Sequence, residues 1–155
     1  MILGTGFDLI DLEDFARTVE RSGEKYIERI YTAQEIEYCR AQPHPSQSFA
    51  ARFAAKEAAM KALGIAGEDA LTWHDFEVVL ESSGRPCMSL HGHAAAKSSA
   101  LNLTHIHVSL SHSRSSAGAL VIAEGSGQAR TLTARAENRH GLSEGEIAKH
   151  LEGDL

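Results

Sequence analysis

Cysteine is scarce in this chain of 155 residues, where only Cys39 and Cys87 occur, far apart and with no C-x-x-C pair. This scarcity excludes a disulfide-stapled scaffold and a cysteine-rich zinc module. We expect both cysteines to be buried thiols.

Long apolar runs are also missing, because charged residues or glycines interrupt every hydrophobic stretch. No basic segment precedes Ile2, so we expect neither a spanning helix nor a cleavable signal, and we expect a cytoplasmic protein. Basic residues are outnumbered, with 15 Lys and Arg against 21 Asp and Glu, a formal charge of −6. Such a charge argues against nucleic acid or an anionic membrane as the main partner.

Common nucleotide and hydrolase motifs are absent as well. Gly4-Thr5-Gly6 lacks the third glycine of a dinucleotide fingerprint, because Leu9 stands at that position. The chain has no Walker A lysine motif and no G-x-S-x-G nucleophile elbow. These absences leave the chemistry to residues scattered along the chain.

The chain does have the apolar content of one compact domain, with 43% hydrophobic residues. Residue patterns and turn signals predict a β, three α, β-hairpin, α, β-hairpin order. The predicted elements are a strand over 2–10, helices over 11–21, 33–40 and 46–63, a hairpin over 76–80 and 86–90, a helix over 93–101, and strands over 106–110 and 117–123.

The composition changes after Glu124 to a polar run rich in glycine, serine and arginine. We therefore predict a domain over 1–124 and an extension over 125–155. Within the extension, 125–141 is interpreted as a linker. A capping box of Ser143 and Glu146 predicts a short helix over 142–151.

The helix predicted over 46–63 is the most informative element. One face is an apolar stripe that includes Lys56, and another consists of alanines, which let a second backbone approach closely. Glu57 and Lys61 lie between these faces, one turn apart. Taken alone, they favour an ion pair on a solvated edge.

Asp8 changes that interpretation, because a carboxylate inside an apolar strand is costly unless it is paired or binds a cation. Asp8 and Glu57 would supply the two carboxylates typical of a Mg²⁺ site. Lys61 would supply a positive charge for a phosphate oxygen. The alternative for Asp8 is a cap or turn carboxylate at the strand end.

Histidines offer a weaker signal. The pairs His91 with His93 and His105 with His107 could share one face as zinc ligands do, but no third ligand stands at a recognisable spacing, so ordinary strand or surface histidines are favoured. His112 lies among hydroxyl residues, a setting suited to binding a phosphate.

Basic residues recur every four positions near the N-terminus. Interleaved acids favour a solvated face of mixed charge, whereas a continuous basic stripe along a helical segment would suit an acidic partner. The residues are Arg17, Arg21, Lys25 and Arg29.

Three segments of the chain follow one another in the order and at the spacing of a known family, and they are Gly4-Thr5-Gly6-Phe7-Asp8, the run from Arg52 to Gly64, and Val108-Ser109-Leu110-Ser111-His112-Ser113. Through these segments the sequence resembles the holo-[acyl-carrier-protein] synthase family, the small bacterial type of 4′-phosphopantetheinyl transferase. The resemblance covers about residues 1–124. It implies an α+β fold with a small antiparallel sheet against a long central helix, assembled as a homotrimer with active sites shared between subunits.

The resemblance also implies a reaction. The 4′-phosphopantetheine group would pass from coenzyme A to a serine of an acidic acyl carrier protein, releasing adenosine 3′,5′-bisphosphate, as in fatty acid biosynthesis. Asp8 and Glu57 would bind Mg²⁺, Lys61 a coenzyme A phosphate, and His112 the 3′-phosphate from the adjacent subunit. Three further residues are implied as cofactor neighbours, namely Arg52, Lys56 and Gly64.

The same resemblance implies that the carrier docks on the first helices through Arg17, Arg21 and Lys25. Asp14 departs from the family pattern, which usually has a basic residue there. Glu57 could accept the serine proton directly or through a water held by the metal, and the sequence leaves both open. Two other functions are considered: another Mg²⁺-dependent phosphotransferase or pyrophosphatase, and a non-catalytic trimeric module that binds coenzyme A.

Overall fold

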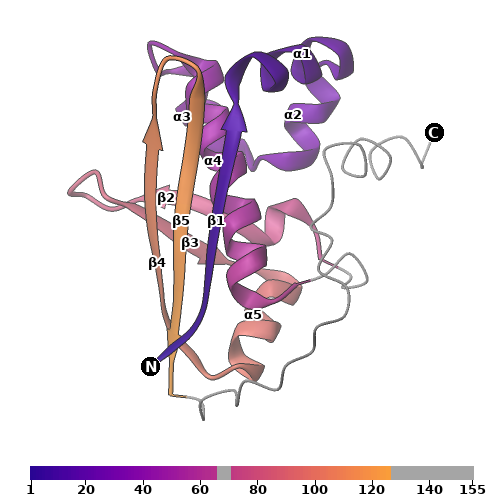
Figure 1. Cartoon of the computed structure of the whole chain (residues 1–155). Helices are drawn as coiled ribbons and strands as arrows, with labels where there is room; N and C mark the ends of the chain where they lie inside the picture. Colours follow the sequence, from indigo (N-terminus) through magenta and orange to yellow (C-terminus); the bar gives the residue numbers. More distant parts are fainter. Residues whose placement is uncertain (66–70, 127–155) are drawn as a thin grey trace, which may run out of the picture.

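Two antiparallel sheets and five α-helices make up the fold, which we describe from a computed structural model for residues 1–65 and 71–126 (Figure 1). The elements are β1 Ile2–Asp11, α1 Leu12–Ser22, α2 Glu24–Ile30, α3 Ala33–Arg40, α4 Pro45–Leu63, the 3₁₀-helix η1 Trp73–Asp75, β2 Phe76–Leu80, β3 Pro86–Leu90, α5 Gly92–Ala100, β4 Leu103–His112 and β5 Ser116–Gly125.

The larger sheet has the order β1-β5-β4, so the last strand lies between the first and the fourth. Side chains alternate between its two faces. Ala119, Val121 and Ala123 of β5 are buried on the inner face, whereas Leu120 is 42% exposed on the outer face. The partners of Leu120 are Phe7 on β1 and Ser109 on β4, which therefore share the outer face.

Helix α4 packs directly on the inner face of this sheet, as Figure 1 shows. Gly4 and Gly6 of β1 make the close approach possible. A Cβ at Gly4 would lie 2.0 Å from the Ala62 carbonyl oxygen, and one at Gly6 would lie 1.9 Å from that of Ala58. The alanine face predicted for this helix is therefore the surface on which the sheet packs.

Hydrophobic side chains form two clusters around α4. One fills the space between α4, the two sheets and α5, and includes Phe76, Val78 and Val121. The other lies under α1, α2 and α3, and its rings pack in tilted and stacked pairs such as Phe53 on Trp73, with centroids 5.0 Å apart. The two clusters bury most faces of α4, which makes it the central helix.

Most predicted elements are confirmed, and their ends generally agree within one or two residues. The hairpin and the helix over 33–40 are among them. Helix α3 begins with a capping box of Thr32 and Glu35, a pattern that the spacing of these two residues in the sequence predicts. Helix α2 and the 3₁₀-helix η1 were not predicted. The strands β4 and β5 extend beyond 106–110 and 117–123, because the backbone ladder continues into the polar residues on both sides.

Gly23, with φ of 70°, separates α1 from α2, so the basic residues at four-residue spacing lie on two helices and the alternative of one continuous stripe does not hold. Two sequence predictions need correction. Gly125 is the last residue of β5 rather than the start of a linker, because its N–H bonds to the Met1 carbonyl. Cys39 is buried as expected, but Cys87 is only partly buried. The remainder of the predicted extension, residues 127–155, includes the predicted helix over 142–151 and lies outside the described residues.

No helix within residues 1–65 and 71–126 combines the length and the apolar character needed to cross a membrane.

Candidate active site

Asp8 lies on the inner face of β1, the face that carries Gly4 and Gly6, and it points toward α4. Its Oδ1 is 2.7 Å from the Nζ of Lys61, which also donates a hydrogen bond to the Phe7 carbonyl at 3.3 Å. Asp8 is 14% exposed and Lys61 is 47% exposed. The glycines let α4 come close enough for this contact, and the ammonium remains accessible from solvent.

Glu57 lies one turn before Lys61 on α4, near enough to Asp8 for the two charges to interact. Burial and then the negative charge of Asp8 raise the pKa of Glu57 to about 7, while Lys61 acts in the opposite direction. Asp8 Oδ2 is buried and has no hydrogen-bond partner. The site therefore holds two carboxylates close together with one oxygen unsatisfied.

This donor set fits a hard divalent cation such as Mg²⁺, which binds one or two carboxylates and completes its coordination with water and phosphate oxygens. A cation would relieve both the repulsion between Asp8 and Glu57 and the unpaired oxygen. Within the described part of the chain, no group of three or more His, Cys, Asp or Glu side chains could hold a metal ion. Oxygens of water and of a bound phosphate would suit the remaining coordination positions.

Tyr26 is a neighbour of this site that sequence reasoning missed. It is buried in α2, and burial together with the nearby Glu57 raises the pKa of its phenol to about 12. No motif or spacing marks Tyr26 in the sequence. It joins the site because α2 packs beside α4, a tertiary contact that the residue pattern does not encode.

Lys56 and Arg52 lie on another face of α4, toward α3. Lys56 has no exposed surface, and its ammonium contacts Glu35 Oε2 at 2.7 Å. Arg52 is 4% exposed and its guanidinium lies 4.1 Å from the centre of the Tyr38 ring. The structure therefore places these two expected cofactor neighbours in the interior, away from the accessible ammonium of Lys61.

Gly64 and His112 have different positions. Gly64 adopts the left-handed conformation, with φ of 62°, and ends α4 one turn after Met60 and Lys61. His112 is exposed at the end of β4, and β5 lies between that strand and β1. Because neighbouring strands are about 5 Å apart, His112 and Asp8 are separated by about 10 Å or more within one chain.

A shallow groove of about 300 Å³ runs over the outer face of the sheet beside His112. Three apolar side chains in it are strongly exposed, namely Phe7 at 59%, Leu9 at 61% and Leu120 at 42%. The rest of its lining includes hydroxyl side chains of Ser109, Ser111, Ser113 and Ser116.

The basic residues near the N-terminus are exposed, but they are not equivalent. Arg17 forms ion pairs with Glu13 and Asp14 on its own helix. Arg21 lies in the last turn of α1 and Lys25 in the first turn of α2. Asp14 therefore offsets part of the positive charge on this surface.

One histidine of each pair contacts an acidic side chain. His91 Nε2 is 3.0 Å from Glu77 Oε2, and His107 Nε2 is 2.9 Å from Glu124 Oε2. The rings of His105 and His107 stack with centroids 6.0 Å apart. This arrangement agrees with ordinary strand and surface histidines rather than zinc ligands.

Comparison with known proteins gives consistent matches. A sequence profile of the 4′-phosphopantetheinyl transferase superfamily matches residues 4–122. The holo-[acyl-carrier-protein] synthase of Geobacter sulfurreducens is 45% identical over 124 residues, 80% of this chain and 98% of that protein. The synthase of Koribacter versatilis is 50% identical over 101 residues, 65% of this chain and 81% of that protein.

Solved structures agree with these matches. The synthase of Neisseria meningitidis superposes with a TM-score of 0.74 at 27% identity, covering 80% of this chain and 99% of that one. The Helicobacter pylori synthase in complex with coenzyme A superposes with a TM-score of 0.68 at 28% identity, covering 77% and 99%. The chain therefore belongs to the holo-[acyl-carrier-protein] synthases, within the 4′-phosphopantetheinyl transferase superfamily.

Proposed function

We propose that this protein transfers the 4′-phosphopantetheine group from coenzyme A to a serine of an apo acyl carrier protein. The products are the holo carrier and adenosine 3′,5′-bisphosphate, and the reaction depends on Mg²⁺. The observation that carries the proposal is the Asp8 carboxylate, paired with the accessible Lys61 ammonium through Oδ1 and without a partner at its buried Oδ2, with the Glu57 carboxyl group nearby. The named activity of the relatives and the coenzyme A in the H. pylori complex support the choice of substrates.

Lys61, Glu57 and Asp8 have different roles at this site. Lys61, fixed by Asp8 but half exposed, presents a positive charge to the phosphate oxygens of the bound pyrophosphate. Glu57 is the group that would accept the proton of the serine hydroxyl, directly or through a water held by the metal. Asp8 and Glu57 would hold Mg²⁺, which stabilises the negative charge that develops on the leaving phosphate.

We further propose a homotrimer in which each active site lies between two subunits. The outer face of the larger sheet exposes Phe7, Leu9 and Leu120 side by side, a patch that a second copy of the chain would cover. His112 stands beside this patch and well away from the Asp8 of its own chain. It would reach the 3′-phosphate of coenzyme A bound to the neighbouring subunit.

The acidic carrier would dock on α1 and α2 through Arg21 and Lys25, with Arg17 contributing less because Asp14 and Glu13 pair with it. We assign the activity to the domain predicted over 1–124, which β5 extends to Gly125 and which includes the whole of the matched segment 4–122. The residues after Gly125 are not required for the chemistry in this proposal. We place the reaction in the cytoplasm, in fatty acid biosynthesis.

The function is tested by incubating the purified protein with coenzyme A, Mg²⁺ and an unmodified acyl carrier protein, and by following the mass of the carrier. A gain equal to one phosphopantetheine group on its serine is expected. Asp8→Ala and Glu57→Ala should abolish the gain while keeping a wild-type circular dichroism spectrum. Glu37→Ala, at an exposed position of α3, is the matched control and should remain active.

No mass gain with several different carriers would contradict the proposed transfer. Hydrolysis of coenzyme A in the absence of a carrier would point instead to a pyrophosphatase. Near-wild-type activity of Asp8→Ala would remove this residue from the catalytic site.

A further inference from the structure

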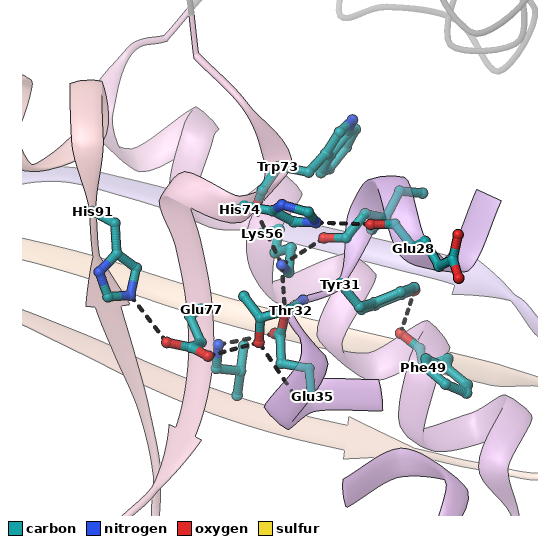
Figure 2. A network of polar contacts seen from close by, with 12 residues as sticks. Glu28, Tyr31, Thr32, Glu35, Phe49, Lys56, Trp73, His74, Glu77 and His91 are labelled. Atoms are coloured by element: carbon teal, nitrogen blue, oxygen red, sulfur yellow. Dashed lines mark hydrogen bonds and ion pairs between the residues drawn. The ribbon is translucent and has the colours of Figure 1, made fainter. Parts of the chain in front are cut away.

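A buried polar cluster joins α4 to α2, α3, η1 and β2 (Figure 2). It lies on the side of α4 that faces away from the larger sheet. The Lys56 ammonium donates to the Ile30 carbonyl at 2.7 Å and to the Trp73 carbonyl at 3.1 Å. Its third contact is Glu35 Oε2, at 2.7 Å. These partners belong to α2, η1 and α3, so a single side chain of α4 is bonded to three separate elements.

Glu35 extends the cluster to the smaller sheet. Its Oε1 accepts a hydrogen bond from Val78 N at 3.0 Å, and its Oε2 accepts one from Thr32 N at 3.0 Å. The Thr32 hydroxyl in turn donates to Glu77 Oε1 at 2.6 Å, as Figure 2 shows. Because the donors of Lys56 and both oxygens of Glu35 are engaged, the cluster is satisfied in one geometry.

The opposite contact of α4 is made of small residues. Gly4 and Gly6 meet the backbone at Ala58 and Ala62, so this surface sets the distance between helix and strand. It offers no large side chain that would resist rotation of the helix, whereas hydrogen bonds depend on direction. The features that define the rotation of α4 therefore include the bonds made by Lys56.

That rotation matters because Glu57 follows Lys56 directly and Lys61 comes one turn later. The end of a side chain lies about 6 Å from a helix axis, so a rotation of about 10° moves it by about 1 Å. A displacement of about 1 Å at a reacting group can cost about a hundredfold in rate.

Stability alone is a weak reason for burying these two charges. Apolar side chains of similar volume often replace a buried ion pair with no loss of stability, whereas removal of one partner alone leaves a costly unpaired charge. The pair links five elements, namely α2, α3, α4, η1 and β2, and its lysine directly precedes Glu57 in α4, so it suits a role in geometry.

We propose that the buried Glu35–Lys56 pair is the positioning element of the active site, because it fixes the rotation of α4 and thereby holds Glu57 and Lys61 opposite Asp8. The inference rests on the proposed function, in which these three residues form the catalytic site. It assigns no contact with coenzyme A to Lys56 itself.

The test uses the double variant Glu35→Met/Lys56→Met, which removes both charges together and keeps the volume. Ile27→Val is the matched control. It removes one methylene group from the hydrophobic cluster beside α2 and leaves every hydrogen bond of the polar cluster in place. We would measure the thermal midpoint, kcat, KM for coenzyme A, and Mn²⁺ affinity by electron paramagnetic resonance on protein mixed with coenzyme A.

The double variant should fold, lose about 30- to 100-fold in kcat, keep KM for coenzyme A within about twofold, and bind Mn²⁺ about tenfold more weakly. Ile27→Val should resemble the wild type in kcat and Mn²⁺ affinity. A folded double variant that matches Ile27→Val in both quantities would overturn the proposal. A raised KM with unchanged kcat would overturn it too, because it would indicate direct contact between Lys56 and coenzyme A.

If the double variant does not fold, Glu35→Gln decides the question by the same measurements, because its amide oxygen can still accept from Val78 N. A wild-type protein that neither modifies a carrier nor binds Mn²⁺ in the presence of coenzyme A would contradict the proposed function. An active wild type with an unaffected variant would contradict the positioning role alone.

Discussion

Glu57 is the residue whose surroundings differ most from what its sequence position suggests. In the sequence it forms an ordinary one-turn pair with Lys61, but the fold turns Lys61 to Asp8 and leaves Glu57 against a like charge. A carboxyl group in such a place binds its proton more tightly in the folded state than in the unfolded chain. Its ionisation therefore becomes a measurable property of the folded site.

We predict that, without divalent cations, Glu57 makes the protein less stable as the pH rises. Its pKa is about 7 when folded, against 4.5 for an ordinary Glu, so the folded state binds more protons between these values. The contribution of Glu57 is full below about pH 4.5, is lost as the pH approaches 7, and amounts to about 1–3 kcal/mol. Urea unfolding at pH 5 and pH 8 in the presence of a chelator measures it.

Glu57→Gln should show a smaller loss of stability between these two pH values than the wild type, and should be the more stable protein at pH 8. Saturating Mg²⁺ should restore stability to the wild type at pH 8 and much less to the variant. An identical pH dependence in both proteins would show that Glu57 ionises normally.

At the scale of elements, the contact between β1 and α4 decides whether a site exists. Gly6 faces the helix, where a Cβ would lie 1.9 Å from the Ala58 carbonyl oxygen and 2.8 Å from its carbon. Both atoms belong to the backbone, so neither can move aside as a flexible side chain would. The strand and the helix would have to separate, and Asp8 would move away from Lys61.

We predict that Gly6→Ala lowers the free energy of unfolding by about 1–3 kcal/mol, through overpacking, and reduces kcat at least tenfold. Gly84→Ala is the control: nothing lies within 4 Å of the added Cβ, and its cost comes from a φ of 83°, about 1 kcal/mol. Chemical denaturation and the carrier assay measure both effects. Unchanged kcat in Gly6→Ala would mean that the β1–α4 spacing does not control the site.

At the scale of the whole molecule, the outer face of the larger sheet carries an exposed apolar patch. Phe7 and Leu120 are partners across the strands and Leu9 is near them, so these side chains form one patch rather than scattered exposed residues. Inner-face residues such as Val121, in contrast, are fully buried. The sheet thus presents a second apolar face, for which the proposed trimer supplies a covering.

We predict that Leu120→Arg converts the trimer to a monomer and abolishes carrier modification, because a charge would be buried at the interface. Gln34→Arg, which adds the same charge at an exposed position of α3, should remain trimeric and active. Sedimentation velocity measures the assembly. A wild type that sediments as a monomer, or an active monomeric variant, would contradict subunit sharing.

Local patterns predicted much of the fold. The capping box at Thr32 and Glu35 marked the start of α3, and the turn residues after Leu80 marked the hairpin, because both signals depend only on neighbouring residues. Helix α2 was missed, since its seven residues follow Gly23 without a capping side chain. The strand predicted over 106–110 stops at Leu110, although the pairing with β5 continues through Ser111 and His112.

The sequence by itself determined most of the helices, the approximate positions of the strands, and Asp8, Glu57 and Lys61 as candidates, because periodicity, caps and the cost of a carboxylate in an apolar strand act locally. Only the tertiary structure decided which partners these residues have. It paired Lys61 with Asp8, brought Tyr26 to Glu57 and buried Lys56 against Glu35. Each of these pairings depends on how closely separate elements approach, and that distance is set by packing across the whole chain.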